Sequence, residues 1–195
     1  MKKISHIIQF ILALYVSVVS IGSLVLYVGP MYPFYMTQIS IWILTFYMVF
    51  YFWLPRLLRT VLYGFLLSIH VIVPTVFWIF LRNLVSDTRQ ISIIWNYLIH
   101  GSDFVVIFLH FLLFRNELPM WTIATNVLFG FFYLAWAWAG VAITGQFVYP
   151  FLNPNDEMAK FLYPGLFIGI AMLSFGWCKI HQFRAKRAKV NFDSV

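Results

Sequence analysis

An imidazole and a carboxyl group lie close together in the middle of a long apolar stretch of this sequence. The stretch ISIIWNYLIHGSDFVVIFLHFLLF covers residues 91–114 and contains His100 and Asp103. In a helix, residues three positions apart lie on the same face, so these two side chains can meet. A carboxylate beside an imidazole fixes the tautomer of the ring and raises its basicity, as in the triads of hydrolases. The pattern therefore indicates acid–base chemistry.

Other polar residues lie on the same helical face or at the same expected depth. At about 100° per residue, Asn96 and His110 fall in one stripe with His100 and Asp103. Thr45, His70 and His100 each lie about nine to eleven residues from the same expected face of the membrane, so the three share one level within a few ångströms. A threonine hydroxyl with a His–Asp base has the composition of an acyl-transfer site. Further polar support is expected from Asn96, His70 and Asn126.

Each of these residues also has a structural explanation, and both explanations stay open. A threonine in a membrane helix usually donates its hydroxyl hydrogen to the carbonyl four residues earlier, which would occupy Thr45. A single buried histidine, such as His70 or His110, usually bridges two helices. The His100–Asp103 pair is the harder one to explain by structure alone, because it places a carboxyl group at depth.

The composition is that of a membrane protein. The chain has 195 residues, of which 63% are hydrophobic and 10% are charged. Soluble domains carry about 25% charged residues, so this chain has too few charges to cover a water-facing surface. Its one cysteine, Cys178, excludes an intrachain disulfide and a thiolate metal cluster. In a membrane, a buried ionisable residue usually faces the interior of the bundle and is a functional candidate.

Six apolar stretches approach the length that a membrane-spanning helix needs, which is about 20 residues. Short segments with Pro, Gly and charged residues separate them. We therefore predict an all-α polytopic membrane bundle that forms one transmembrane domain over residues 1–195. Pro74, four residues after His70, is expected to kink the third span. The predicted spans are 7–29, 36–54, 61–81, 91–114, 121–144 and 158–178, followed by a basic tail at 179–195.

The basic residues are distributed unequally between the two sides of these spans. Of the 13 Lys and Arg residues, ten lie on the side of both termini and three on the other side. Cytoplasmic loops carry an excess of Lys and Arg, so both termini are predicted to be cytosolic. This topology accounts for most of the net charge of +7 and argues against a nucleic-acid partner. The basic tail is expected to contact anionic lipid headgroups.

Four short patches resemble one family of membrane proteins. The segment TGQFVYPFLN at residues 144–153 resembles the Thr-Gly-x-Trp-Val-Tyr-Pro-Phe-Leu segment that follows the fifth helix in the androgen-induced-protein family. The stretch WILTFYMVF resembles the family's Trp-x-x-Leu-Thr-Phe motif, and LIHGSD resembles its Leu-Asn-His-Gly-x-His motif. FWIF resembles a Phe-Trp pair at the end of the third helix. TGQFVYPFLN is the most specific of these patches, and the six-span layout also agrees.

The resemblance implies an enzyme activity. Characterised animal members of the family are hydrolases of fatty acid esters of hydroxy fatty acids, with a Thr and a His within the bilayer as the catalytic pair. By motif, the Thr corresponds to Thr45, and the first His of the second motif corresponds to His100. The second His, which is assigned to catalysis, corresponds to Asp103. The resemblance thus implies an intramembrane lipid-ester hydrolase of the endoplasmic reticulum that needs no metal and no cofactor.

Two other functions fit the same residues. Because Asp103 stands where the family has its catalytic His, the protein could be a non-catalytic relative that binds membrane lipid or serves in assembly. In that case Asp103 and the histidines form contacts between helices. As a third interpretation, His70 and His100 at equal depth could ligate haem, or Asp103 and His110 could carry protons.

Overall fold

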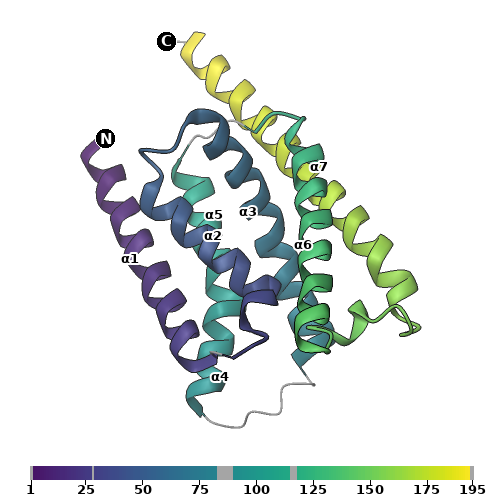
Figure 1. Ribbon diagram of the computed structural model, residues 1–195. Helices are drawn as coiled ribbons and strands as arrows, with labels where there is room; N and C mark the ends of the chain where they lie inside the picture. Colours follow the sequence, from purple (N-terminus) through teal and green to yellow (C-terminus); the bar gives the residue numbers. More distant parts are fainter. Residues whose placement is uncertain (1, 28, 83–89, 115–117, 194–195) are drawn as a thin grey trace.

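Every regular element of the protein, within the residues described, is a helix. The computed structural model describes residues 2–27, 29–82, 90–114 and 118–193. The predicted all-α class is confirmed (Figure 1). The elements are α1 (Lys2–Tyr27), the 3-10 turn η1 (Tyr32–Phe34), α2 (Met36–Phe50), α3 (Arg56–Val76), the π-turn η2 (Phe77–Leu81), α4 (Gln90–Tyr97), the π-turn η4 (Leu98–Ser102), α5 (Asp103–Leu113), α6 (Thr122–Thr144), the 3-10 turn η5 (Pro150–Leu152) and α7 (Ala159–Asp193).

Five helical stretches of the described chain are long and apolar enough to cross a membrane. They are Ile4–Leu26, Arg56–Leu81, Ile93–Leu113, Thr122–Thr144 and Ala159–Lys186. The second predicted span, 36–54, is helical only over the 15 residues of α2. At 1.5 Å per residue such a helix is about 22 Å long, which is shorter than the roughly 30 Å of a hydrocarbon core. Pro55 disfavours helical backbone at Leu54, so the chain does not continue as one helix from α2 into α3.

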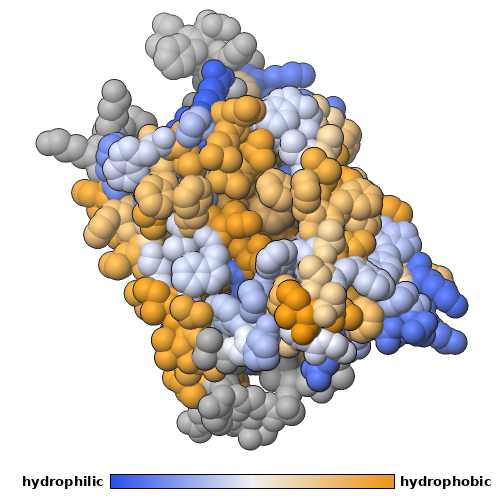
Figure 2. All heavy atoms as spheres, in the orientation of Figure 1, coloured by the Kyte–Doolittle hydropathy of each residue, from blue (hydrophilic) through white to orange (hydrophobic). Residues whose placement is uncertain are grey.

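The outer surface is that of an integral multi-pass membrane protein. Figure 2 shows apolar side chains over the middle of the visible face, with hydrophilic residues near the C-terminal part of α7 and near the α6–α7 connection. Large apolar side chains of α1 point outward along its whole length, among them Ile7, Phe10, Leu14 and Val18. Both chain termini lie at the same end of the bundle (Figure 1). Which side of the membrane that end meets stays a prediction, and Asp87, Arg89, Arg115 and Glu117 lie outside the described residues.

Helix α3 is the centre of the bundle. It contacts α2, α5, α6 and α7, while α1 packs along α2. The side chains that fill the space between α2, α3 and α5 are almost fully buried, and include Leu44, Tyr47, Tyr63, Leu66 and Ile107. This core holds the half of the bundle that contains the termini, whereas the other half contains a cavity.

Two π-turns lie opposite each other beside this cavity. Helix α3 continues through Pro74 to Val76 and then widens into η2. The fourth span is likewise interrupted by η4, which contains His100. The indole Nε1 of Trp78 in η2 donates a hydrogen bond of 3.4 Å to the carbonyl of His100 in η4. π-turns within α-helices are frequent at functional sites. The cavity beside this contact is therefore a candidate functional site.

Candidate functional site

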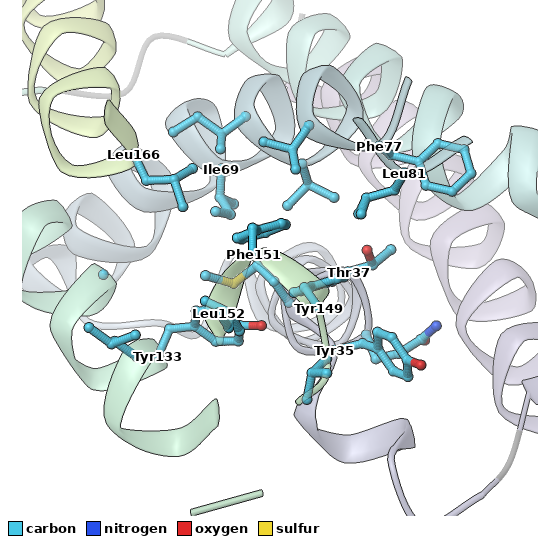
Figure 3. A pocket seen from close by; sticks show the side chains of 18 of the residues that line it. Tyr35, Thr37, Ile69, Phe77, Leu81, Tyr133, Tyr149, Phe151, Leu152 and Leu166 are labelled. Atoms are coloured by element: carbon cyan, nitrogen blue, oxygen red, sulfur yellow. The ribbon is translucent and has the colours of Figure 1, made fainter. Parts of the chain in front are cut away.

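A cavity of about 480 Å³ lies in the half of the bundle away from the chain termini (Figure 3). Its walls come from the start of α2, the end of α3 with η2, the α4–η4 segment, α6, the connection that contains η5, and α7. Most of the lining is aliphatic or aromatic, and includes Ile69, Ile72, Val73, Val76, Leu81, Leu134, Leu166, Phe167 and Ile170.

The polar groups of the cavity are amides, hydroxyls and one imidazole. They belong to Thr37, Gln38, Asn96, His100 and five tyrosines, namely Tyr32, Tyr35, Tyr133, Tyr149 and Tyr163. Among the described residues that line the cavity there is no Lys, Arg, Asp or Glu. Ligand cavities in proteins typically combine an apolar lining with a few polar groups that orient the ligand, and this cavity has that composition.

His100 is held in the cavity wall by an aromatic stack. Its ring lies against the ring of Phe77, with centroids 3.6 Å apart and planes 6° from parallel. The side chain of His100 is only 7% exposed, and its Nδ1 atom is buried without a hydrogen-bond partner among the described residues. A buried polar atom without a partner is costly in a folded protein, so this atom is a candidate for contact with a ligand.

The connection between α6 and α7 folds inward and forms one wall of the cavity. Helix α6 ends at Gly145, whose φ of 72° is left-handed and favours glycine. The chain then turns back, so that Phe151 and Leu152 are buried and the ring of Tyr149 stacks on Phe151 at 5.2 Å. In Figure 3 the side chain of Phe151 lies between the walls formed by α3 and by the start of α2. The segment with the most specific family resemblance therefore builds the cavity.

The phenol of Tyr149 lies at the first turn of α2. This helix has no side-chain cap at its N-terminus, so its first backbone N–H groups lack helical partners. Tyr149 forms hydrogen bonds with the backbone of Met36 and Thr37 and with the Thr37 side chain. Figure 3 shows Tyr149 beside Thr37. Burial raises the pKa of Tyr149 to about 12, so the phenol stays protonated at physiological pH. Tyr149 thus ties the α6–α7 connection to α2.

The structure divides the polar stripe predicted for the fourth span. Asn96 and His100 line the cavity, whereas Asp103 and His110 lie in the core and do not line it. Both carboxyl oxygens of Asp103 are buried without a hydrogen-bond partner in the described chain, so Asp103 does not hydrogen-bond to His100. The reason is η4, because a π-turn is wound by i→i+5 bonds and the spacing of 100° per residue does not hold through it.

Thr45 belongs to α2, and its side chain faces α1 rather than the cavity. Its hydroxyl is 2.5 Å from Oγ of Ser20 and donates to the carbonyl of Ile41 at 2.8 Å. Ile41 packs in one cluster with Ile99, and α2 runs parallel to the fourth span (Figure 1). Thr45 and Asp103 each follow one of these isoleucines by four residues. Thr45 thus lies one helical turn beyond the contact of Ile41 with Ile99.

The remaining sequence-predicted residues lie in the core. Asn126 donates to Oγ of Ser174 at 2.9 Å, and that oxygen is 3.0 Å from Oγ of Ser68. These residues join α6, α7 and α3. His70 is 2% exposed and does not line the cavity, and its Nε2 atom has no partner among the described residues. The proposed roles of these residues in chemistry stay predictions.

The most informative cavity residues were not predicted as site residues from the sequence. Thr37, Tyr133 and Tyr149 read as ordinary residues of an apolar, aromatic-rich chain. A signal was present for Tyr149, because it lies within TGQFVYPFLN, the segment with the most specific resemblance. That segment thus carries the family resemblance and also supplies side chains to the cavity wall.

A comparison with family models agrees with the resemblance found in the sequence. The model described as FAR-17a/AIG1-like protein matches residues 55–183. The chain belongs to this family. The matched region contains His100, Asp103 and the α6–α7 connection, whereas Thr45 and Thr37 on α2 lie outside it. Searches of curated proteins and of solved structures give no match to this chain.

Proposed function

We propose that this protein of the FAR-17a/AIG1-like family binds a lipid molecule within the membrane, in the cavity between α2, α3, α4, α6 and α7. The observation that carries the proposal is an apolar cavity of about 480 Å³ inside a membrane-spanning bundle. Pockets of about 300–1,000 Å³ hold drug-sized molecules, so this one accepts a lipid with one acyl chain. Apolar side chains of α3, α6 and α7 form the part of the wall that contacts the acyl chain.

Photoaffinity labelling tests this proposal directly. A monoacylglycerol with a diazirine in its acyl chain is irradiated with the purified protein, and the labelled residues are mapped by mass spectrometry. We expect labels on Val73, Leu134 and Leu166, which line the cavity. One outward-facing residue near each provides the matched control, namely Ile79 at 65%, Leu128 at 52% and Ile168 at 59% exposed. Labels mainly on these three outward residues would contradict lipid binding in the cavity.

A second candidate function is hydrolysis of a lipid ester, as the family resemblance implies. Two observations favour it. His100 lines the cavity, and Asp103 carries two buried carboxyl oxygens without partners among the described residues. Intramembrane carboxyl groups are costly and usually serve a function. Thr45 lies on α2, a helix that contacts the fourth span.

In this second function, the hydroxyl oxygen of Thr45 attacks the ester carbonyl and gives up its proton to a base supplied by His100 and Asp103. The alcohol part of the ester leaves with that proton, and the acyl group stays on Thr45. Water then attacks the acyl-threonine, which releases the fatty acid and restores the hydroxyl. For this to happen Thr45 must exchange its bond to the Ile41 carbonyl for a contact with the substrate.

A fluorophosphonate probe separates the two functions. Hydrolysis predicts that the probe labels wild-type protein, that Thr45→Ala abolishes labelling and that Asp103→Asn weakens it. Thr75→Ala is the matched control, since Thr75 is an exposed threonine that donates to the carbonyl of Val71. Absence of labelling in folded wild-type protein would contradict hydrolysis and would leave lipid binding standing.

We also infer the membrane and the orientation in which the protein works. The family resemblance supports the endoplasmic reticulum, and the distribution of Lys and Arg supports two cytosolic termini. Fluorescence microscopy of a tagged protein tests the first inference. The second is tested by adding protease to sealed internal membranes that contain the protein with a tag at each end. Protection of either tag from the protease would contradict the inferred orientation.

A further inference from the structure

The chemistry of the cavity wall also specifies a class of ligand. Resting on the proposed lipid binding, we propose that the ligand is an uncharged lipid whose ester or hydroxyl group hydrogen-bonds to Gln38, Asn96 and His100. These three residues line the cavity from α2, α4 and η4. We refer to them as the polar wall. The acyl chain of the ligand lies along the apolar side chains of α3, α6 and α7.

The three side chains of the polar wall can donate or accept hydrogen bonds with a ligand. Gln38 accepts a hydrogen bond of 2.7 Å from Oγ of Ser23 through its Oε1 atom, which orients the amide. Asn96 lies four residues before His100, one turn away along the same segment. The stack on Phe77 fixes the ring plane of His100, and the buried Nδ1 atom has no protein partner within the described residues. The tyrosines contribute less, because Tyr133 and Tyr163 already donate to the carbonyls of Phe34 and Leu152.

A charged lipid does not match this wall. Burial of a carboxylate or phosphate requires a cationic partner, and no Lys or Arg is among the described lining residues. The nearest cation along the chain, Arg82, follows the lining residue Leu81 but is exposed, and its guanidinium carbon lies 5.4 Å from the centre of the Trp78 ring. The described wall therefore favours a lipid whose buried part is uncharged.

Two lipids with the same acyl chain, one neutral and one charged, test the neutral ligand class separately from lipid binding itself. Purified full-length protein in an uncharged detergent is titrated at pH 8 with oleoylglycerol and, separately, with oleate. We expect oleoylglycerol to bind at least tenfold more tightly, because a buried carboxylate lacks a partner here. Equal binding, or tighter binding of oleate, would overturn the neutral class and leave the proposed function intact. Absence of binding by both lipids would overturn the proposed function.

A pair of matched variants tests the polar wall. His100→Phe keeps an aromatic ring against Phe77 but removes both ring nitrogens. We expect it to weaken oleoylglycerol about fivefold to tenfold, which is the usual effect of one lost hydrogen bond. His6→Phe is the control, because His6 also stacks on a phenylalanine, Phe52, with centroids 4.2 Å apart, and it does not line the cavity. If His100→Phe binds oleoylglycerol as tightly as His6→Phe does, the role of His100 in the polar wall is wrong.

Discussion

The imidazole ring of His100 lies flat on the phenyl ring of Phe77, joining the two π-turns beside the cavity. The two residues belong to helical segments that are separate in the sequence, so their stack links α3 to the fourth span. The neighbouring bond from Trp78 to the carbonyl of His100 makes the same link. The position of the one imidazole in the cavity therefore depends on η2.

Loss of this stack should loosen the link. Phe77 is 7% exposed, and an aromatic pair contributes about 0.5–1.5 kcal/mol beyond its buried area. We expect Phe77→Leu to lower the free energy of unfolding by about 1–2 kcal/mol. Phe80→Leu is the control in the same turn, because Phe80 is 39% exposed. The buried thiol of Cys178, the only cysteine, reports unfolding through its reaction with a thiol dye. Equal stabilities of the two variants would refute the link.

The bridge between Asn126 and Ser174 is expected to stabilise the bundle without contributing to ligand binding. Hydrogen bonds between membrane helices are worth about 0.6–2 kcal/mol. Asn126→Ala should cost about that much in the same thiol assay and leave the affinity for oleoylglycerol unchanged. Thr125→Ala is the control, because Thr125 bonds only to the carbonyl of Thr122 within its own helix among the bonds observed. A large loss of affinity in Asn126→Ala would instead support the predicted role of Asn126 in the site.

Arg184 of α7 holds the C-terminal end of α5. Its guanidinium donates to the carbonyls of Phe111 at 2.7 Å and Leu112 at 3.3 Å. A cation at a helix C-terminus satisfies free carbonyls and interacts favourably with the helix dipole. We expect Arg184→Gln to destabilise the protein by about 1–2 kcal/mol. Lys179→Gln, earlier in the same helix, should have an effect below about 0.5 kcal/mol. Similar losses in both variants would point to a general effect of charge.

Replacement by alanine should affect stability differently at two glycines near the fourth span. A Cβ atom on Gly22 would lie 2.3 Å from a ring carbon of Trp95, whereas a Cβ atom on Gly101 would meet nothing within 4 Å. Gly22→Ala should therefore cost about 1–3 kcal/mol through overpacking of α1 on α4. Gly101→Ala should be tolerated, because the added methyl group has open space. Thermal unfolding of the two variants decides between them, and a stable Gly22→Ala variant would contradict the packing of α1.

The helices could be predicted from the sequence because their signals are local. Apolar length and the break at Gly145 predicted a fifth span of 121–144, and α6 covers Thr122–Thr144. The site could be predicted only in part. The stripe that joins His100 to Asp103 assumes a regular α-helix, and η4 interrupts that helix between them. The contact of Tyr149 with the first turn of α2 joins residues more than 100 positions apart, and no local pattern reports such a contact.

The presence of one lipid molecule in the cavity is tested most directly by filling the cavity. Ile72 lines it, whereas Ile79 is 65% exposed on the outer surface, so Ile72→Trp and Ile79→Trp make the same chemical change inside and outside. Native mass spectrometry counts the oleoylglycerol molecules that remain on the protein after release from detergent. We predict one bound molecule on the wild-type protein and on Ile79→Trp, and none on Ile72→Trp. One bound molecule on Ile72→Trp as well, with the variant folded, would contradict lipid binding in the cavity.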